Sequence, residues 1–146
     1  MSIITYGHGI CTDNIHTTID KIKTLLAMAP RAYDLCCDAF KDAEDDGIDT
    51  VGEFADYIGQ GWSHHEEAGL ATILAVVINE CEDIMLLATT DQYANAFLVM
   101  PEKLPWKLTD KQKALTEEAL NDIFRKYVNV LTDEPIVIEY QSIEND

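Results

Sequence analysis

The chain has 146 residues, of which 47% are hydrophobic, and a formal net charge of −17. These values are typical of one globular domain, residues 1–146, and they exclude an intrinsically disordered chain. The excess of acids also argues against direct binding to nucleic acid or to an anionic membrane surface. The sequence opens with no signal-peptide pattern, and we expect a cytoplasmic protein.

The first part of the chain predicts a short strand, a turn and an amphipathic helix. Residues 2–6 have the composition of an edge strand, and Gly7 and Gly9 predict a turn after it. Thr12 or Asp13 is expected to cap the helix that follows, because apolar residues then recur at helical spacing.

A row of aspartates marks the second predicted helix, over residues 31–44. Pro30 suits its first turn, and four aspartates spaced by four, four and three residues share one side of it. With two that follow, the candidate partner-binding residues are Asp34, Asp38, Asp42, Asp45, Asp46 and Asp49. Like charges at this spacing cost roughly 0.2–0.5 kcal/mol per pair. A helix that carries such a row is therefore a candidate binding face.

The surrounding segment, residues 32–83, has 14 acidic residues and a single basic one, Lys41, so it carries −13 of the total −17. A field of this sign attracts basic proteins and speeds their encounter. In composition the chain is similar to small acidic immunity proteins of toxin systems and to DNA-mimic inhibitors. That similarity implies a non-enzymatic domain that neutralises a basic nuclease or another nucleic-acid-binding protein. A surface that only keeps the protein in solution is the alternative.

Residues 42–53 resemble the EF-hand calcium loop, D-x-[DN]-x-[DN]-G-x5-E, with Gly47 at the turn position. The candidate calcium ligands are Asp42, Glu44, Asp46 and Glu53. The glutamate at the third loop position and Asp49 at an otherwise apolar position depart from the template. A helix C-cap at Gly47, followed by a capping box from Thr50 to Glu53, explains the same residues. Calcium-dependent regulation and a plain turn are thus two alternative predictions.

The centre of the fold is predicted to be one buried helix followed by a β-hairpin over residues 84–100. Ser63 and Glu66 have capping-box spacing, and residues 68–78 are almost entirely apolar, so the helix has no polar face. The alternative is a strand over residues 73–78, where most side chains are β-branched.

A helix over residues 110–131 and a strand over residues 136–143 complete the chain. The order of elements predicts an α+β fold, with about five helices on a small, mainly antiparallel sheet. Its strands are the hairpin, the carboxyl-terminal strand and, as a further candidate, residues 2–6. The side chains expected to be almost fully buried are Leu74, Val77, Leu86, Phe97, Phe124 and Ile138.

The sequence contains no recognisable catalytic motif, and we predict no catalytic residue. The cysteines, at positions 11, 36, 37 and 81, lack the spacing of a metal or redox pair, so reduced core residues are expected. Nucleotide-binding loops and nucleophile-elbow motifs are absent from the sequence. A small enzyme of unknown class is therefore the alternative with the least support.

Overall fold

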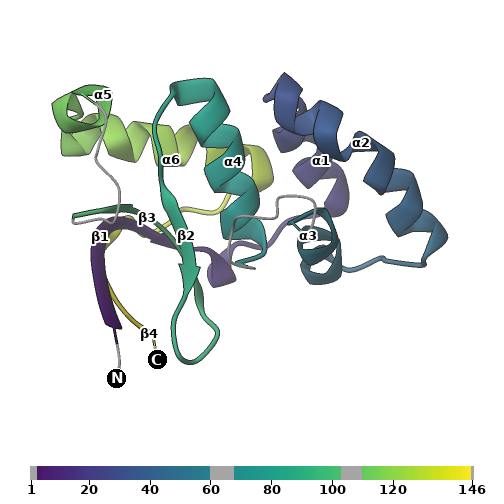
Figure 1. Cartoon of the computed structure of the whole chain (residues 1–146), viewed down its shortest axis with the longest axis horizontal. Coiled ribbons are helices and arrows are strands. Elements are labelled where there is room, and N and C mark those ends of the chain that lie inside the picture. Colours follow the sequence, from purple (N-terminus) through teal and green to yellow (C-terminus); the bar gives the residue numbers. More distant parts are fainter. Residues whose placement is uncertain (1–2, 60–67, 103–109, 146) are drawn as a thin grey trace.

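A computed structural model of the chain describes residues 3–59, 68–102 and 110–145. The α-helices of this described part are α1 (Ile19–Ala27), α2 (Pro30–Asp45), α3 (Val51–Gly59), α4 (Leu70–Glu82), α5 (Asp110–Ala114) and α6 (Glu117–Leu131). The strands are β1 (Ile3–Cys11), β2 (Leu87–Thr90), β3 (Ala96–Pro101) and β4 (Glu139–Asn145). All strand pairs are antiparallel, in the order β2-β3-β1-β4. The predicted single α+β domain is confirmed, and its helices lie on one side of the sheet (Figure 1).

Helix α4 is the central element of the fold. It contacts α1, α2, α3 and α6 as well as strands β2 and β3. Almost every residue from Ala71 to Ile78 is buried, as expected for a helix that is apolar on all sides. The strand alternative for this segment is therefore wrong. Gly69, with φ of 55°, precedes the helix, while the predicted capping box of Ser63 and Glu66 lies outside the described residues.

The predicted hairpin is confirmed and consists of β2 and β3. In the turn between them, the Asp91 carboxylate accepts hydrogen bonds from the backbone N–H groups of Tyr93 and Asn95. Other boundaries differ from those predicted. Helix α1 begins at Ile19, because Thr18 caps it by accepting a hydrogen bond from the Lys21 N–H. The last strand, predicted over residues 136–143, is Glu139–Asn145.

The helix predicted over residues 110–131 is interrupted and forms α5 and α6. Thr116 causes the break, since its side chain accepts a hydrogen bond from the Ala119 N–H and so starts a new helix. The Gln112 side chain is buried and donates to the Met85 carbonyl, which holds α5 against the segment before β2.

The predicted turn at Gly7 and Gly9 is wrong, because both glycines lie inside β1. A Cβ atom at Gly9 would come within 2.1 Å of the Leu98 carbonyl oxygen, so only glycine fits this close approach to β3. The end of β4 reaches the β2–β3 turn. The Gln92 N–H donates to the Glu144 carbonyl over 2.9 Å, which fixes that contact.

The core prediction is confirmed for Leu74, Val77, Leu86 and Phe124, which are buried, and wrong for the other two residues. Phe97 and Ile138 are only half-buried. In β3 it is Leu98 that faces the helices, and Phe97 points to the opposite face of the sheet. The apolar run in β3 does not alternate with polar residues, so it gave no signal for the face that each side chain takes.

Candidate functional site

Helix α2 displays the aspartate row, and α4 holds the start of α2 in place. Pro30 occupies the first helical turn, and Ala29 offers no side-chain cap. The Glu80 carboxylate of α4 caps the helix instead, accepting hydrogen bonds of 2.9 Å from the backbone N–H groups of Arg31 and Ala32. A carboxylate at this position satisfies the free N–H groups and complements the positive end of the helix dipole.

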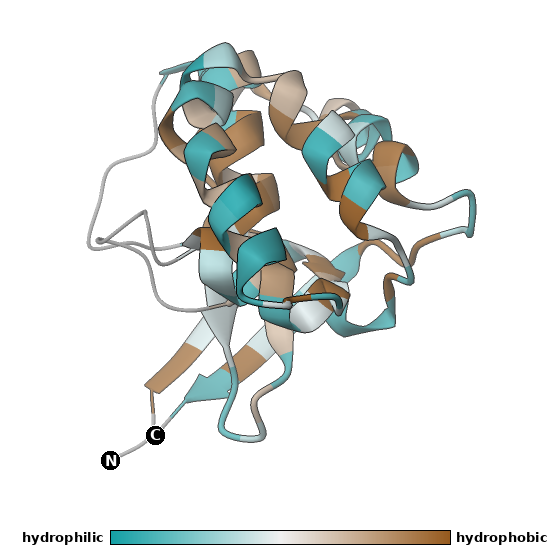
Figure 2. Cartoon of the chain, turned by 90° about the vertical axis from the view of Figure 1, so that its right-hand side faces the viewer, coloured by the Kyte–Doolittle hydropathy of each residue, from teal (hydrophilic) through white to brown (hydrophobic). Residues whose placement is uncertain are grey.

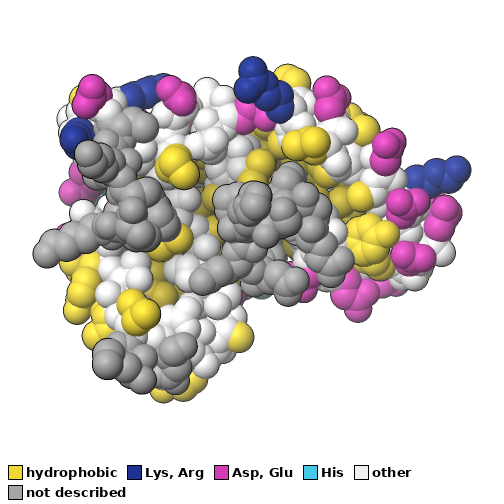
Figure 3. All heavy atoms as spheres, viewed as in Figure 1, with side chains coloured by type: hydrophobic (Ala, Val, Ile, Leu, Met, Phe, Trp, Pro, Cys, Tyr) yellow, Lys and Arg dark blue, Asp and Glu magenta, His cyan; other side chains and the backbone are white. Residues whose placement is uncertain are grey.

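All six predicted partner-binding residues are exposed: Asp34, Asp38, Asp42, Asp45, Asp46 and Asp49. Four lie on α2, Asp46 ends that helix, and Asp49 lies in the turn before α3. The opposite side of α2 packs through Ala32, Cys36 and Ala43. We call these six aspartates the acidic face. Figure 3 shows acidic side chains gathered at this end of the molecule, with hydrophobic ones beside them.

The ion pairs found in the described part of the chain involve other residues, so the acidic face is not neutralised by them. The Tyr57 hydroxyl approaches one member, Asp46, at 3.4 Å. Figure 2 shows this end of the molecule face on, and its front helices combine hydrophilic and hydrophobic residues, as amphipathic helices do. The sequence thus placed the row correctly on an exposed helix surface.

The stretch over residues 42–53 forms the end of one helix and the start of the next. Gly47 adopts φ of 76°, its N–H donates to the Glu44 carbonyl, and the Ile48 N–H donates to the Ala43 carbonyl. This pair of bonds is the Schellman motif of a helix C-terminus. The Thr50 hydroxyl then accepts a hydrogen bond of 3.3 Å from the Glu53 N–H. The C-cap and the Thr50 cap expected from the sequence are therefore present.

This geometry separates the four candidate calcium ligands. Asp42 and Glu44 both lie within α2, two residues apart, so their side chains leave the helix in different directions. Asp46 ends that helix and Glu53 lies in the first turn of α3. Across the described residues, no group of three or more His, Cys, Asp or Glu side chains is arranged to hold a metal ion. Calcium binding by residues 42–53 stays an untested alternative, as in the sequence analysis.

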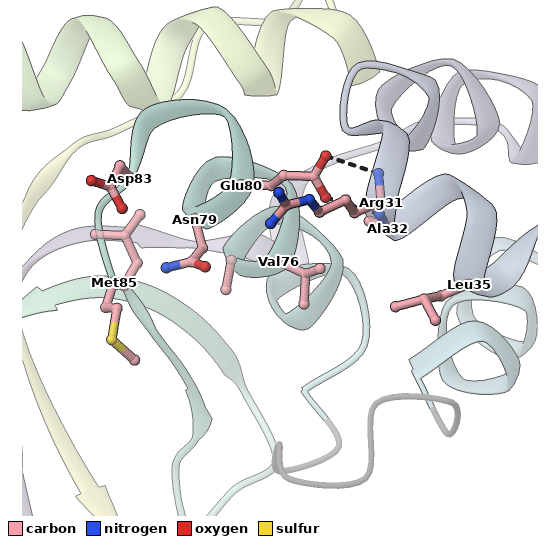
Figure 4. Close-up of a pocket in the computed structure, with 10 residues that line it drawn as sticks. Arg31, Ala32, Leu35, Val76, Asn79, Glu80, Asp83 and Met85 are labelled. Atoms are coloured by element: carbon pink, nitrogen blue, oxygen red, sulfur yellow. Dashed lines mark hydrogen bonds between the residues drawn. The ribbon is translucent and has the colours of Figure 1, made fainter.

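A groove of about 730 Å³ lies between α2 and α4, and its lining combines apolar side chains with Arg31, Asn79, Glu80 and Asp83. Figure 4 shows Leu35 on the α2 side, Val76 and Asn79 on α4, and Met85 at the opposite end. Leu35 is 77% exposed and Met85 is 47% exposed, whereas Val76 is half-buried. This groove could not be predicted from the sequence, because its walls come from segments about 45 residues apart. Leu35, a lone leucine between Asp34 and Asp38, was the available signal.

Of the four cysteines, Cys36 is buried, Cys11 and Cys37 are half-buried, and Cys81 is exposed. Burial, with repulsion from the neighbouring Cys37, raises the pKa of Cys36 to about 11. Such a thiol is almost entirely protonated at neutral pH and is a poor nucleophile. Cys81 is exposed, contrary to the expectation that all four cysteines belong to the core.

Among the described helices, none is long and apolar enough to cross a membrane. Comparisons with protein-family models, curated proteins and solved structures found no match for the chain. The chemistry of the acidic face and the groove is therefore the basis for interpreting function.

Proposed function

We propose that the protein is a non-enzymatic binding domain whose acidic face docks on a basic protein and blocks that partner's nucleic-acid-binding surface. One observation carries the proposal: six exposed aspartates lie together at one end of the molecule, in a segment with a single basic residue. Carboxylates displayed in this way compete with phosphates for the lysines and arginines of a nucleic-acid-binding groove. The proposal includes a cytoplasmic location, where a nuclease or similar partner acts.

The physical support for this proposal is that α2 carries a row of aspartates whose mutual repulsion is unfavourable in the free protein. Aspartates three and four residues apart on α2 repel one another, and the ion pairs of the described chain do not relieve them. Concentrated charge of one sign creates a potential that accelerates association with an oppositely charged partner. The repulsion between these aspartates falls when lysines and arginines dock on them.

A capture experiment tests this function with two variants of equal net charge. The first replaces Asp34, Asp38 and Asp42 with Asn on the acidic face. The matched control is Asp133→Asn, Glu139→Gln and Glu144→Gln, three exposed acids elsewhere in the chain. Each protein is immobilised and exposed to native cell lysate at low salt, and bound proteins are then eluted with duplex DNA.

We expect the wild type and the control variant to retain the same basic protein and to release it to DNA, because the DNA phosphates compete for the same site. The variant of the acidic face should retain little of it. Recovery of no DNA-displaceable basic protein by the wild type, or equal recovery by both variants, would contradict the proposed function.

A further inference from the structure

Two large apolar side chains in the groove between α2 and α4, those of Leu35 and Met85, are exposed and lie outside the hydrophobic core. Leu35 and Met85 line the groove from opposite ends, and Val76 forms part of its floor. A single exposed leucine among polar residues is common on protein surfaces and needs no functional explanation. Here the exposed leucine instead borders a groove of about 730 Å³ with a second apolar side chain at its other end.

The charges around these apolar groups are mostly acidic. Asp34 and Asp38 are exposed neighbours of Leu35 on α2, outside the residues that line the groove, and Asp83 lines it next to Met85. Arg31 is the basic residue of the lining. It lies beside Glu80, whose carboxylate is already occupied by the backbone of α2. Exposed acids thus lie beside the apolar side chains at both ends of the groove, and we call Asp34, Asp38 and Asp83 its acidic rims.

We propose that this groove binds the apolar face of a basic amphipathic helix belonging to the partner, an inference that rests on the proposed function. A helix with leucine-like residues at positions i, i+3, i+4 and i+7 presents a stripe that fits an apolar groove. Lysines and arginines at the edges of that stripe meet the acidic rims, and their methylene stems cover more apolar surface. Met85 has an unbranched, adaptable side chain and can follow the shape of the entering residues.

Charge complementarity selects this occupant. A neutral apolar helix would leave the rim carboxylates next to an apolar surface without compensating charge, at a cost in desolvation. A uniformly basic extended segment would meet the acids but leave Leu35 and Met85 in water, so no apolar area would be buried. A basic amphipathic helix satisfies both features of the groove.

The inference can be tested with two synthetic peptides of about 18 residues, long enough for a stable helix. One is built of leucine and lysine in amphipathic order, and the other has the same composition in an order that leaves no apolar stripe. Binding of each labelled peptide is measured by fluorescence anisotropy at low salt and at about 0.15 M salt. The proteins compared are the wild type, Leu35→Gln, Met85→Gln and Val137→Gln. Val137 is a matched control, an apolar side chain 69% exposed outside the groove.

We expect the wild type and Val137→Gln to bind the amphipathic peptide about tenfold or more tightly than the scrambled one, since the groove buries apolar area only with the former. Leu35→Gln and Met85→Gln should reduce that preference severalfold without changing the circular dichroism spectrum, because both side chains are exposed. Equal affinity of the wild type for both peptides, or an unchanged preference in Leu35→Gln, would overturn the inference.

The same assay separates this inference from the proposed function. If both peptides bind equally and both are weakened by replacing Asp34, Asp38 and Asp42 with Asn, the acidic face still docks basic segments and only the groove inference fails. If that variant binds both peptides as the wild type does, the acidic face itself has no docking role. The groove inference would then have lost its premise.

Discussion

Two glutamates near the end of α4 each hold a different neighbouring helix. Glu80 caps α2 through the N–H groups of Arg31 and Ala32. Glu82 accepts a hydrogen bond from the buried hydroxyl of Tyr127 in α6. It also forms an ion pair with Lys126 of the same helix, with 3.1 Å between the Lys126 Nζ and a Glu82 carboxylate oxygen. Neither contact can be predicted from the sequence, because the partners lie more than 40 residues away.

The Glu82 contact predicts how stability depends on pH. Burial would raise the pKa of Glu82, but the hydrogen bonds from Tyr127 and Lys126 and the charges of Lys126 and Lys111 outweigh it and lower the pKa. A lowered pKa in the folded protein adds stability above the pKa of the unfolded chain, about 4.3. That stability is lost as the pH falls through the lower, folded value.

Glu82→Gln should therefore reduce the free energy of unfolding by about 1–3 kcal/mol at pH 7, the usual effect of losing a hydrogen bond to a charged group. The difference from the wild type should shrink as the pH falls below about 4. Urea unfolding across this pH range measures it, with Glu118→Gln, an exposed acid on α6, as the control. A difference that stays constant down to acid unfolding would show that Glu82 carries no such linkage.

At the residue scale, substitution of two glycines by alanine should change the stability of the fold in opposite directions. A methyl group at Gly9 would collide with the backbone of β3, whereas a methyl group at Gly52 in α3 would meet nothing within 4 Å. Gly9→Ala should destabilise the fold by about 1–3 kcal/mol, as overpacking does. Gly52→Ala should stabilise it by roughly 0.5–1 kcal/mol, since alanine is the better helix former. Equal unfolding midpoints for the two variants would contradict the close approach of β1 to β3 at Gly9.

At the scale of elements, features set by neighbouring residues could be predicted from the sequence. Pro30 at the start of α2, Gly47 at its C-cap and the Thr50 cap of α3 all appear as expected. Contacts between distant segments could not be predicted. Strand β1 continues through Gly7 and Gly9 because it pairs closely with β3, where Gly9 approaches Leu98. This pairing joins segments about 90 residues apart and cannot be predicted from the residues around the glycines. The groove likewise exists only once α2 lies against α4.

The structure of residues 42–53, the end of α2 followed by a turn and the start of α3, predicts that calcium does not stabilise the protein. Millimolar calcium should shift the melting temperature no more than magnesium does, because Asp42 and Glu44 remain in α2 on different sides of the helix. A site of micromolar affinity would instead add about 4 kcal/mol at that concentration. Differential scanning fluorimetry with both ions measures this. A large shift seen only with calcium and lost in Glu53→Gln would favour the EF-hand alternative.

At the scale of the whole molecule, the core and the acidic face lie on opposite sides of α2. The buried residues of the helices and the sheet form one apolar cluster that includes Leu74, Leu98 and Phe124, and α2 joins it through the side opposite its aspartates. The acidic face lies on α2 and the following turn, at one end of the molecule (Figures 1 and 3). Changes to the acidic face should therefore alter binding without altering the fold.

The core makes the complementary prediction. Phe124→Ala should lower the free energy of unfolding by about 3–5 kcal/mol, since this fully buried side chain leaves a cavity. That loss is a large share of the 5–15 kcal/mol typical of a whole domain. Phe97→Ala should cost clearly less, because Phe97 is only half-buried. Chemical denaturation of both variants tests this order, and an equal or larger loss at Phe97 would contradict it.

The measurement that tests the docking face most directly is the association rate with the captured basic partner over a series of salt concentrations. For the wild type the rate should fall steeply with salt, because steering by the acidic face is screened over a Debye length of about 10 Å at 0.1 M. Replacing Asp34, Asp38 and Asp42 with Asn should slow association at low salt and flatten that dependence, while the control variant at positions 133, 139 and 144 stays close to the wild type. An association rate equal to that of the wild type at every salt concentration would contradict the docking role of the acidic face.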